Sequence, residues 1–160
     1  MILNNNLKII QTKQKGKGYI TTKQIPKNAP ILEFKGTIET IKIHDKSNEN
    51  FLQISESRYL HIYEEFGLYV NHSCDPNCYV HIAGHRAFLY SLYVIQPNSE
   101  LTFDYSLTCT NTIDQWNMSC KCGSSICRNI ISGFQYLSED IKIKYKKLNI
   151  LPNYIIKGLR

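Results

Sequence analysis

One octet decides the fold of this 160-residue chain: Asn71-His72-Ser73-Cys74-Asp75-Pro76-Asn77-Cys78. Its residues are small, polar and turn-forming, a composition that disfavours the interior of a strand or a helix. Asparagine, histidine and serine side chains offer donors and acceptors that can tie two crossing loops together. The octet is therefore expected where separate parts of the chain are held against one another.

Two further motifs follow the octet along the chain. Residues 100–105 read ELTFDY, and residues 120–128 read CKCGSSICR, so that three thiols lie within eight residues. Short polar steps between clustered thiols are typical of metal ligands. A secreted disulfide framework, in contrast, usually staples a smaller, loop-rich chain. The spacing therefore favours reduced cysteines that bind a metal.

Taken in this order, the motifs resemble the SET-domain family of protein-lysine methyltransferases, together with its zinc-bearing post-SET segment. The octet is highly specific, and ELTFDY reinforces it. Gly16, Gly18 and residues 34–36 (FKG) fall in the right order upstream, and the matches run to about Arg128. The resemblance implies that the chain transfers a methyl group from S-adenosylmethionine to a substrate lysine.

The resemblance also implies a fold. It is the mainly β, SET-domain β-clip fold of several small sheets, in which the segment around Asn71 threads through a loop that contains Tyr105. This pseudoknot would put the cofactor and the substrate lysine on opposite faces of a narrow channel. Threaded chains are rare, so periodicity alone does not predict this topology. We expect a SET domain over 1–110, a post-SET zinc segment over 111–134 and a helical extension over 135–160.

Local patterns agree with a mainly β chain. Short stretches rich in Ile, Tyr, Phe and Thr, separated by turn residues, predict strands over 7–11, 18–25, 31–43, 51–62, 79–83 and 86–95. The last two form the best hairpin candidate, and no sustained helical period occurs before residue 110. One short C-terminal helix is expected over 138–149, because Ser138 is a good N-cap, Tyr145 shares a face with two other apolar residues, and Pro152 follows.

Several residues match functional positions of the family. Tyr105 matches the active-site tyrosine, whose hydroxyl lies near the transferred methyl group. Because the chain has eleven tyrosines, only the motif distinguishes it from a buried structural tyrosine. Asn71 and His72 match residues that bind the cofactor, largely through backbone and amide contacts. The loop over the methionine part of the cofactor is matched by Gly16, Lys17, Gly18 and Tyr19, although Gly16 could equally be an ordinary turn glycine.

Two phenylalanines bear on the number of methyl groups transferred. Phe34 stands where many relatives carry tyrosine, so a hydroxyl that would bond the substrate amine is absent. At Phe103 the family uses tyrosine or phenylalanine to limit how many methyl groups fit. We take both, with Tyr105, as candidate catalytic residues and expect di- or trimethylation; plain core packing of the two rings is the alternative. A further departure is Leu68, where many relatives have arginine.

A zinc site follows from the resemblance, which supplies the fourth ligand that a tetrahedral structural site requires. The expected ligands are Cys74, Cys120, Cys122 and Cys127. The metal would clip the C-terminal segment onto the active site; four buried thiols without metal are the alternative. Cys78 is expected to be buried and unreactive, and Cys109 has no expected role. Phe134 and Tyr136 are the candidates for an aromatic lid over the cofactor.

Composition and charge limit the partners. No apolar run approaches the ~20 residues that a bilayer span needs, and no secretory signal is visible, so we expect an intracellular protein of the cytoplasm or nucleus without membrane contact. The net charge is +6, yet the stretch between Glu33 and Asp75 contains eight acidic residues and only four basic ones. This segment suits a basic peptide such as a histone tail, and the basic remainder a chromatin or nucleic-acid contact.

Other interpretations remain open at this point. Ordinary solvated surface is the alternative for most of these charges, and the lysines of residues 142–147 look like the polar side of a helix. The chain could be a zinc-stabilised binding module, although zinc-finger helix spacing and an aromatic platform for single strands are missing. It could also be an inactive SET relative that only binds cofactor or peptide; the intact Tyr105 favours an enzyme. Dimerisation is not readable from the sequence.

Overall fold

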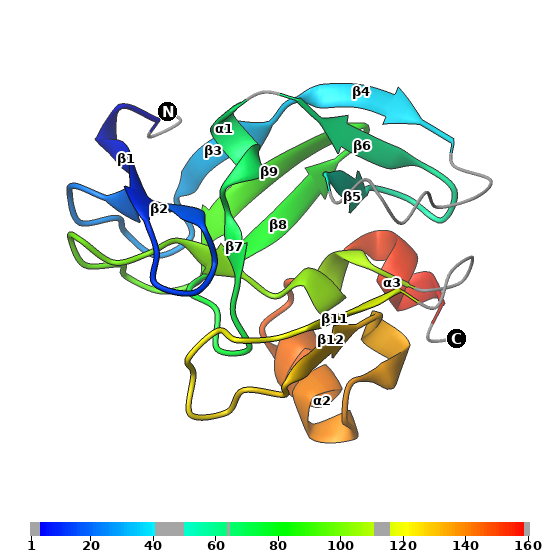
Figure 1. The fold of residues 1–160 in the computed structure, drawn as a ribbon. Helices are drawn as coiled ribbons and strands as arrows, with labels where there is room; N and C mark the ends of the chain where they lie inside the picture. Colours follow the sequence, from blue (N-terminus) through cyan, green and yellow to red (C-terminus); the bar gives the residue numbers. More distant parts are fainter. Residues whose placement is uncertain (1–3, 41–49, 64, 111–115, 159–160) are drawn as a thin grey trace.

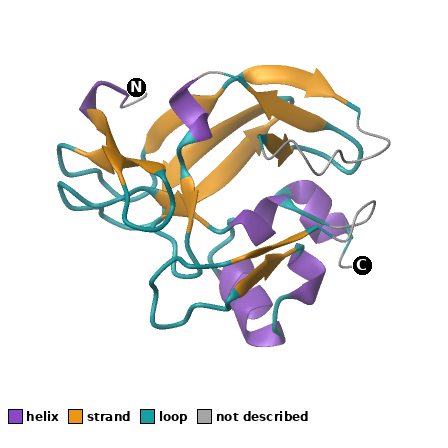
Figure 2. Cartoon of the chain, in the orientation of Figure 1, coloured by secondary structure: helices purple, strands orange, loops and turns teal. Residues whose placement is uncertain are grey.

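Strands dominate the computed structural model, which describes residues 4–40, 50–63, 65–110 and 116–158. Within these residues the strands form small sheets of two or three members, and the longer helices gather on the C-terminal side (Figure 2). The expected mainly β fold with a short C-terminal helix is confirmed.

The sheets combine strands from distant parts of the chain. Three two-stranded sheets pair β1 (Leu7–Gln11) with β2 (Lys17–Thr21), β7 (Asn71–His72) with β10 (Thr102–Phe103), and β11 (Asn117–Ser119) with β12 (Ile130–Ser132). Two three-stranded sheets have the orders β3 (Pro30–Phe34), β9 (Arg86–Ser91), β8 (Cys78–Ala83) and β4 (Gly36–Glu39), β6 (Tyr59–Ile62), β5 (Phe51–Gln53). Every pair is antiparallel except β7 with β10.

Two predicted stretches fold back on themselves. The hairpin expected over 79–83 and 86–95 is confirmed as β8 and β9, and Gly84 turns the chain with a φ of +62°. The stretch predicted as one strand over 51–62 is a second hairpin, β5 and β6, because residues 54–58 form a turn between them. The sequence pattern identified the extended residues and missed this turn.

A glycine explains why the strand predicted over 31–43 is divided. β3 and β4 belong to different sheets and meet at Gly36. A Cβ atom at this position would lie 2.0 Å from the carbonyl oxygen of His61, which is far inside van der Waals contact. Only glycine therefore lets β4 approach β6 in this register. The last residues of the predicted strand, 41–43, lie outside the described residues.

The octet joins two segments that are far apart in the sequence. β7 and β10 run side by side in parallel, and the N–H of Ser73 extends the pairing by donating to the carbonyl of Phe103 at 3.2 Å. The side chain of Asn77 bridges to the same partner segment: its Nδ2 donates to the carbonyl of Glu100 at 2.8 Å, and its Oδ1 accepts from the N–H of Thr102 at 3.0 Å. The octet thus ties the two crossing segments together, as its composition predicted.

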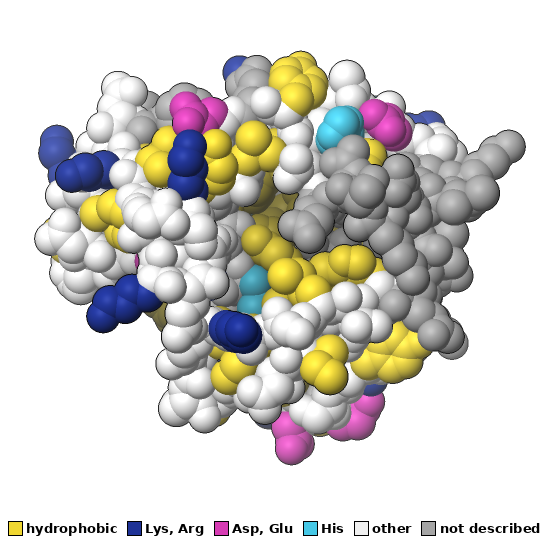
Figure 3. Space-filling model, in the orientation of Figure 1, with side chains coloured by type: hydrophobic (Ala, Val, Ile, Leu, Met, Phe, Trp, Pro, Cys, Tyr) yellow, Lys and Arg dark blue, Asp and Glu magenta, His cyan; other side chains and the backbone are white. Residues whose placement is uncertain are grey.

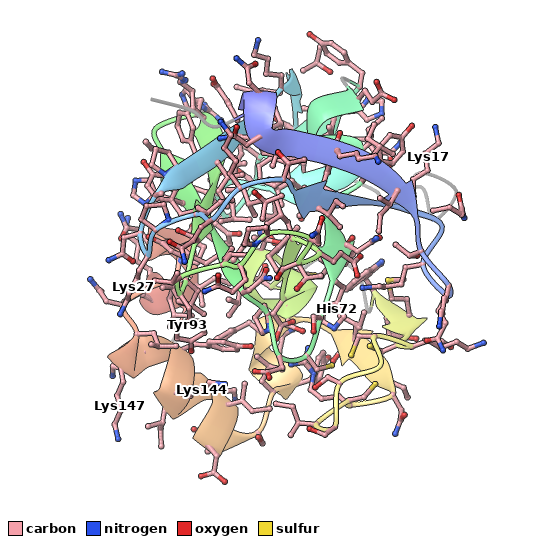
Figure 4. The ribbon with its side chains drawn as sticks, turned by 90° about the vertical axis from the view of Figure 1, so that its left-hand side faces the viewer. Lys17, Lys27, His72, Tyr93, Lys144 and Lys147 are labelled. Atoms are coloured by element: carbon pink, nitrogen blue, oxygen red, sulfur yellow. The ribbon has the colours of Figure 1, made fainter. Side chains whose placement is uncertain are left out.

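Helical segments complete the fold. They are η1 (Asn4–Asn6), α1 (Glu65–Leu68), η2 (Tyr105–Thr108), η3 (Phe134–Tyr136), α2 (Glu139–Lys147) and α3 (Asn153–Lys157). The helix predicted over 138–149 is α2, with Ser138 at the N-cap position although its side chain makes no capping hydrogen bond. Lys144 and Lys147 are exposed on α2, at the surface of the molecule, as expected for the polar side of a helix (Figure 4).

The second C-terminal helix was not predicted. α3 begins directly after Pro152, the residue that was expected to end helical structure. Proline lacks an N–H, which the start of a helix does not need, so it suits this position as well as a helix stop.

In Figure 1, α2 lies at the opposite end of the molecule from β4. No helix among the described residues is long and apolar enough to cross a membrane.

Two large hydrophobic cores, beside a small cluster around Cys74, Cys120 and Ile131, hold these parts together. The larger core lies among the sheets and includes residues from β2, β3, β6, β8 and β9. The second core joins the C-terminal helices to η2, and its buried members are Leu92, Leu107, Phe134, Leu137, Tyr145, Ile150, Leu151, Tyr154 and Ile155. The segment after residue 132 therefore has a packed core of its own, which also contacts the turn that follows β10.

Candidate active site

A cavity of about 720 Å³ lies between the sheets and the C-terminal segment. This volume falls in the range of small-molecule and cofactor sites. Its wall includes Phe34, Asn71, His72, Phe103, Tyr105 and Trp116. The space-filling view shows a hollow with a hydrophobic floor and a histidine side chain at one end of it (Figure 3). The two crossing segments of the fold therefore open onto the same cavity.

Tyr105 stands at the crossing itself, on the first turn of η2. Its hydroxyl donates to the carbonyl oxygen of Val70 at 2.9 Å, and its backbone N–H donates to Nδ1 of His72 at 3.2 Å. Its ring lies 4.8 Å from the ring of Phe103, centroid to centroid. His72 of the octet thus holds the backbone of Tyr105, and Val70, the residue just before the octet, holds its phenol. A phenol oxygen that donates its proton can also accept a hydrogen bond.

Phe34 and Phe103 form an apolar wall beside Tyr105. Their ring centroids are 6.0 Å apart in an edge-to-face arrangement, and both side chains are buried in the larger core. Both also line the cavity. Core packing and cavity lining, which the sequence left as alternatives, therefore apply to the same two rings.

His72 uses its ring to connect Tyr105 with Cys74. Nδ1 accepts the Tyr105 N–H, while Nε2 lies 3.3 Å from Sγ of Cys74. Burial lowers the pKa of His72 to about 4, so the ring is neutral at pH 7 and carries its proton on Nε2. The nearby Asp104 carboxylate, 3.6 Å from Nδ1, therefore forms no ion pair with it at neutral pH. Figure 4 shows His72 beside the segment that carries the clustered cysteines.

Asn71 anchors the N-terminal hairpin at the edge of the cavity. Its Nδ2 donates to the carbonyl of Lys17 and to Oε1 of Glu100, both at 2.9 Å. Glu100 in turn pairs with Lys15 at 2.7 Å. A Cβ atom at Gly18 would lie 2.8 Å from that same Nδ2, so a glycine is required for this close approach. Here the missing side chain makes room for Asn71.

The residues expected to bind the cofactor divide into two groups. Lys17, Asn71, His72 and Tyr105 line the cavity, whereas Gly16, Gly18 and Tyr19 do not. Gly16 has a φ of +70° and open space around it, which is the geometry of an ordinary turn glycine. Tyr19 is 1% exposed, and its hydroxyl donates to the carbonyl of Glu65. Tyr19 therefore connects β2 to α1 within the core.

Four cysteines meet on the C-terminal side of the cavity. The sulfur atoms of Cys74, Cys120, Cys122 and Cys127 all lie within 4.8 Å of one another. Sγ of Cys74 is 3.7 Å from Sγ of Cys120, and a tetrahedral zinc with Zn–S bonds of ~2.3 Å needs sulfurs about 3.8 Å apart. Burial raises the pKa of the Cys74 and Cys120 thiols, whereas at Cys122 hydrogen bonds from the backbone at Cys74 and Ser124 outweigh burial and lower the pKa to about 6. The donor set fits zinc.

A buried carboxylate lies between Tyr105 and the cysteine cluster, and the sequence analysis missed it. Asp104 is completely buried and receives two hydrogen bonds from the guanidinium of Arg128, at 2.6 and 2.7 Å. Burial alone would raise the pKa of Asp104, yet the Arg128 pair holds it below its usual value. Tyr145 of α2 donates a further hydrogen bond at 2.8 Å. Asp104 ends the ELTFD run and Arg128 follows the last clustered cysteine, but no local pattern links them to each other.

The aromatic residues near the cavity differ from those expected. Phe134 is buried in the second core and Tyr136 is 60% exposed; neither lines the cavity. Trp116 does line it, and it packs against the cluster that contains Cys74 and Cys120. It is the only tryptophan of the chain, and its position four residues before the clustered thiols was the signal that could have identified it.

The remaining cysteines have different environments. Cys78 is fully buried, and burial raises its pKa well above the usual range, so its thiol is unreactive, as expected. Cys109 is partly buried and lines the cavity. Leu68 stands where many members of the family have arginine, and it also lines the cavity. The cavity wall in this region is therefore more apolar than an arginine would make it.

Comparison with known proteins identifies one family, that of the SET domain. The family model of the SET domain matches residues 16–106. The chain is 29% identical over 138 residues to the histone-lysine N-methyltransferase ash1 of Drosophila melanogaster, covering 76% of this chain and 6% of that protein. It is 28% identical over 145 residues to the H3 lysine-36 specific histone-lysine N-methyltransferase of Candida albicans, covering 81% and 17%. The chain thus spans less than a fifth of either relative.

Solved structures also resemble this chain. One is the crystal structure of KRYPTONITE in complex with mCHH DNA, an H3(1–15) peptide and SAH, with a TM-score of 0.65 and 24% identity over 79% of this chain and 29% of that one. Another is KRYPTONITE with mCHG DNA and SAH, with a TM-score of 0.64 and 25% identity over the same shares. In both cases the similarity extends over 79% of this chain.

Proposed function

Because the chain belongs to the SET-domain family, we propose that it transfers a methyl group from S-adenosylmethionine to a lysine side chain of a protein. The observation that carries this proposal is the position of Tyr105. Its phenol lies in the wall of a cofactor-sized cavity, at the crossing of the octet with ELTFDY, beside an apolar wall. This arrangement suits the alignment of an amine with a methyl donor.

The chemistry requires a neutral amine and an exact line of approach. S-adenosylmethionine, when bound, supplies a methyl group on a positively charged sulfur. The lysine nitrogen forms a bond to that carbon as the carbon–sulfur bond breaks, and its proton leaves to water. Free lysine has a pKa of ~10.4, and burial beside Phe34 and Phe103 favours the neutral form. Tyr105 would accept a hydrogen bond from the amine and orient it, so its contribution is alignment.

Cofactor binding is proposed for the part of the cavity near the N-terminal hairpin. Lys17, Asn71 and His72 form its wall there, and Lys15 lies beside them. Trp116 enters the same cavity from the C-terminal segment, so we propose it as the aromatic side chain that covers the cofactor. Gly18 would act indirectly, by allowing Asn71 to hold the hairpin in place.

Zinc is proposed to order the C-terminal wall of the site. The four sulfurs fit its tetrahedral geometry, and Cys74 belongs to the octet whereas the other three belong to the segment over 111–134. One metal would therefore join that segment to the SET domain over 1–110. The extension over 135–160 supplies most of the second core, which supports its treatment as a separate part.

The product is proposed to carry more than one methyl group. Neither Phe34 nor Phe103 brings a hydroxyl into the cavity wall. A hydroxyl at these positions would bond the amine or fix a water molecule in the space that further methyl groups need. The apolar wall therefore supports di- or trimethylation.

A basic segment such as a histone tail is the proposed substrate. The relatives named above are histone-lysine methyltransferases, and one KRYPTONITE structure holds an H3 peptide together with DNA. These names support a chromatin substrate and hence a nuclear site of action. The acidic residues between Glu33 and Asp75 are less available to a basic peptide than expected, because Glu33 pairs with Arg86 and Glu39 contacts His61. Part of it lies outside the described residues.

The test is transfer of a labelled methyl group. Purified protein, labelled S-adenosylmethionine and either histones or a mixed protein extract should give a labelled band, and mass spectrometry should identify the lysine. Tyr105→Phe is the control. Equal, background counts from the wild type and from this variant would refute methyl transfer as the function of this chain.

A further inference from the structure

We propose that Tyr145, in helix α2 of the C-terminal extension, is a positioning residue for Tyr105 and acts through the buried carboxylate of Asp104. The family match ends at residue 106, so this assigns an active-site role to a helix outside it. The inference deepens the proposed function and rests on it for its kinetic test. It also has a structural test that does not need catalysis.

The first step links Asp104 to Tyr105. Asp104 is the N-cap residue of η2, the short helix that begins with Tyr105, and its Oδ1 accepts the N–H of Ser106 at 3.1 Å. An N-cap side chain of this kind fixes the first turn of a helix, because it satisfies a backbone donor that has no partner inside the helix. The orientation of the Asp104 carboxylate therefore sets the direction of the turn that carries the phenol.

The second step concerns the balance of donors around this carboxylate. Oδ1 receives hydrogen bonds from Ser106 and from Nη2 of Arg128, whereas Oδ2 receives them from Nη1 of Arg128 and from the Tyr145 hydroxyl. Asp104 is 0% exposed, so water does not replace a lost donor. Without the Tyr145 hydroxyl, Arg128 is the remaining protein donor to Oδ2 among these contacts. The carboxylate can then turn away from Ser106.

The third step separates the hydroxyl of Tyr145 from its ring. The ring is buried in the second core, which also contains Leu107 of η2. Packing of the ring anchors α2 against the turn, and the hydroxyl reaches from this core to Asp104. Tyr145→Phe keeps the packing and removes only the hydrogen bond, so the variant is expected to fold.

Tyr154 provides a matched control within the same extension. It is also buried in the second core, and its hydroxyl also donates a hydrogen bond, to the backbone carbonyl of Gln53 at 2.9 Å. That partner lies in β5 and not in η2, and Tyr154 does not line the cavity. Tyr154→Phe therefore reproduces the loss of one buried hydroxyl without any effect on the Asp104 carboxylate.

The kinetic experiment compares the two variants in methyl transfer. We expect kcat to fall about tenfold for Tyr145→Phe, which corresponds to one hydrogen bond to a charged group, with KM for S-adenosylmethionine changed less than about twofold. Tyr154→Phe should change neither constant by more than about twofold, although both variants should lose a similar few degrees in melting temperature. An equal fall of kcat in both variants, or an unchanged kcat in Tyr145→Phe, would overturn the proposal.

Hydrogen exchange tests the same link without catalysis. The amides of Tyr105 and Ser106 donate to His72 and Asp104, and they should exchange faster in Tyr145→Phe but not in Tyr154→Phe. Arg128→Lys, which keeps the charge but loses the two-pronged contact, should accelerate the same amides. If the wild type transfers no methyl group, the proposed function fails while the exchange rates still decide this inference. Unchanged exchange at both amides in Tyr145→Phe would refute it.

Discussion

The crossing of residues 71–78 with residues 100–105 and the C-terminal part after residue 115 contribute to the site in different ways. The crossing is made of contiguous motifs whose backbones pair directly, as β7 with β10. The C-terminal part contributes single side chains, among them Trp116, Arg128 and Tyr145, which reach the site from separate elements. A site can thus be recognised from one region while its geometry depends on another.

Metal removal should have the largest effect, and it should begin in the C-terminal part. Structural zinc sites contribute on the order of 10 kcal/mol of apparent binding free energy, so a strong chelator or Cys122→Ser should release the metal and unfold the segment around it. Metal analysis and thermal unfolding measure this. Cys109→Ser is the control, since Cys109 lies outside the cluster, and it should keep the same metal content. If Cys122→Ser binds as much metal as the wild type, the proposed zinc site is wrong.

Asp104→Asn should be the most damaging single change at the junction of the two regions. It leaves the Arg128 guanidinium, whose side chain is only 15% exposed, without its counter-charge, which costs about 3 kcal/mol of unfolding free energy. Denaturant unfolding at pH 7 measures the loss. A variant as stable as the wild type would show that the carboxylate does not hold the regions together.

The same group predicts the response to acid. The folded-state pKa of Asp104 lies below its unfolded value, because Arg128 outweighs the effect of burial. Its stabilisation is therefore fully present above the unfolded pKa of ~3.9 and is lost as the pH falls through the folded value. Melting temperature against pH should fall less steeply below pH ~4 in Asp104→Asn than in the wild type. Parallel curves would contradict this assignment.

Tyr105→Phe tests the crossing by itself. Loss of the phenol oxygen should lower kcat on the order of 10²-fold by misaligning the amine, whereas the melting temperature should fall by only a few degrees, because the ring stays in place and one hydrogen bond, to the Val70 carbonyl, is lost. Tyr79→Phe, on β8 and away from the cavity wall, is the matched control. A Tyr105→Phe variant with wild-type turnover would show that the phenol at the crossing is not needed for methyl transfer.

Phe103→Tyr should have the smallest effect and should change the product more than the rate. The added hydroxyl would occupy space beside Tyr105 and shift the products several-fold toward monomethyl-lysine, which corresponds to about 1 kcal/mol. Mass spectrometry of the methylated substrate at long reaction times measures this ratio. Phe88→Tyr, on β9 outside the cavity wall, should leave it unchanged. A wild type that yields only monomethyl product would refute the proposal at its origin.

The residues of the crossing were identified well because the octet and ELTFDY are local motifs, whereas the crossing itself was implied by the family resemblance. The octet and ELTFDY are short, and their polar groups pair in the manner that their composition suggests, with Asn77 bridging the two segments. The clustered thiols were equally local in three of their four members. Cys74 entered only through the family resemblance, and the four sulfurs do lie together.

The errors arose where distant residues decide local structure. The division between β3 and β4 depends on the contact of Gly36 with the backbone of His61, and these residues are far apart in sequence. α3 was missed because Pro152 is compatible with both the end and the start of a helix. Trp116 was missed because its position four residues before the clustered thiols does not by itself reveal a cavity that other segments complete.

The amino-acid sequence by itself determined the mainly β character, the clustered thiols, the C-terminal helix and the residues at the crossing, since these depend on composition and short spacings. Only the tertiary structure decided that Arg128 and Tyr145 share the buried carboxylate of Asp104, and that Tyr19 belongs to the core while Trp116 belongs to the cavity. The physical reason is that burial and hydrogen-bond partners depend on three-dimensional packing, which brings together side chains that no local pattern relates.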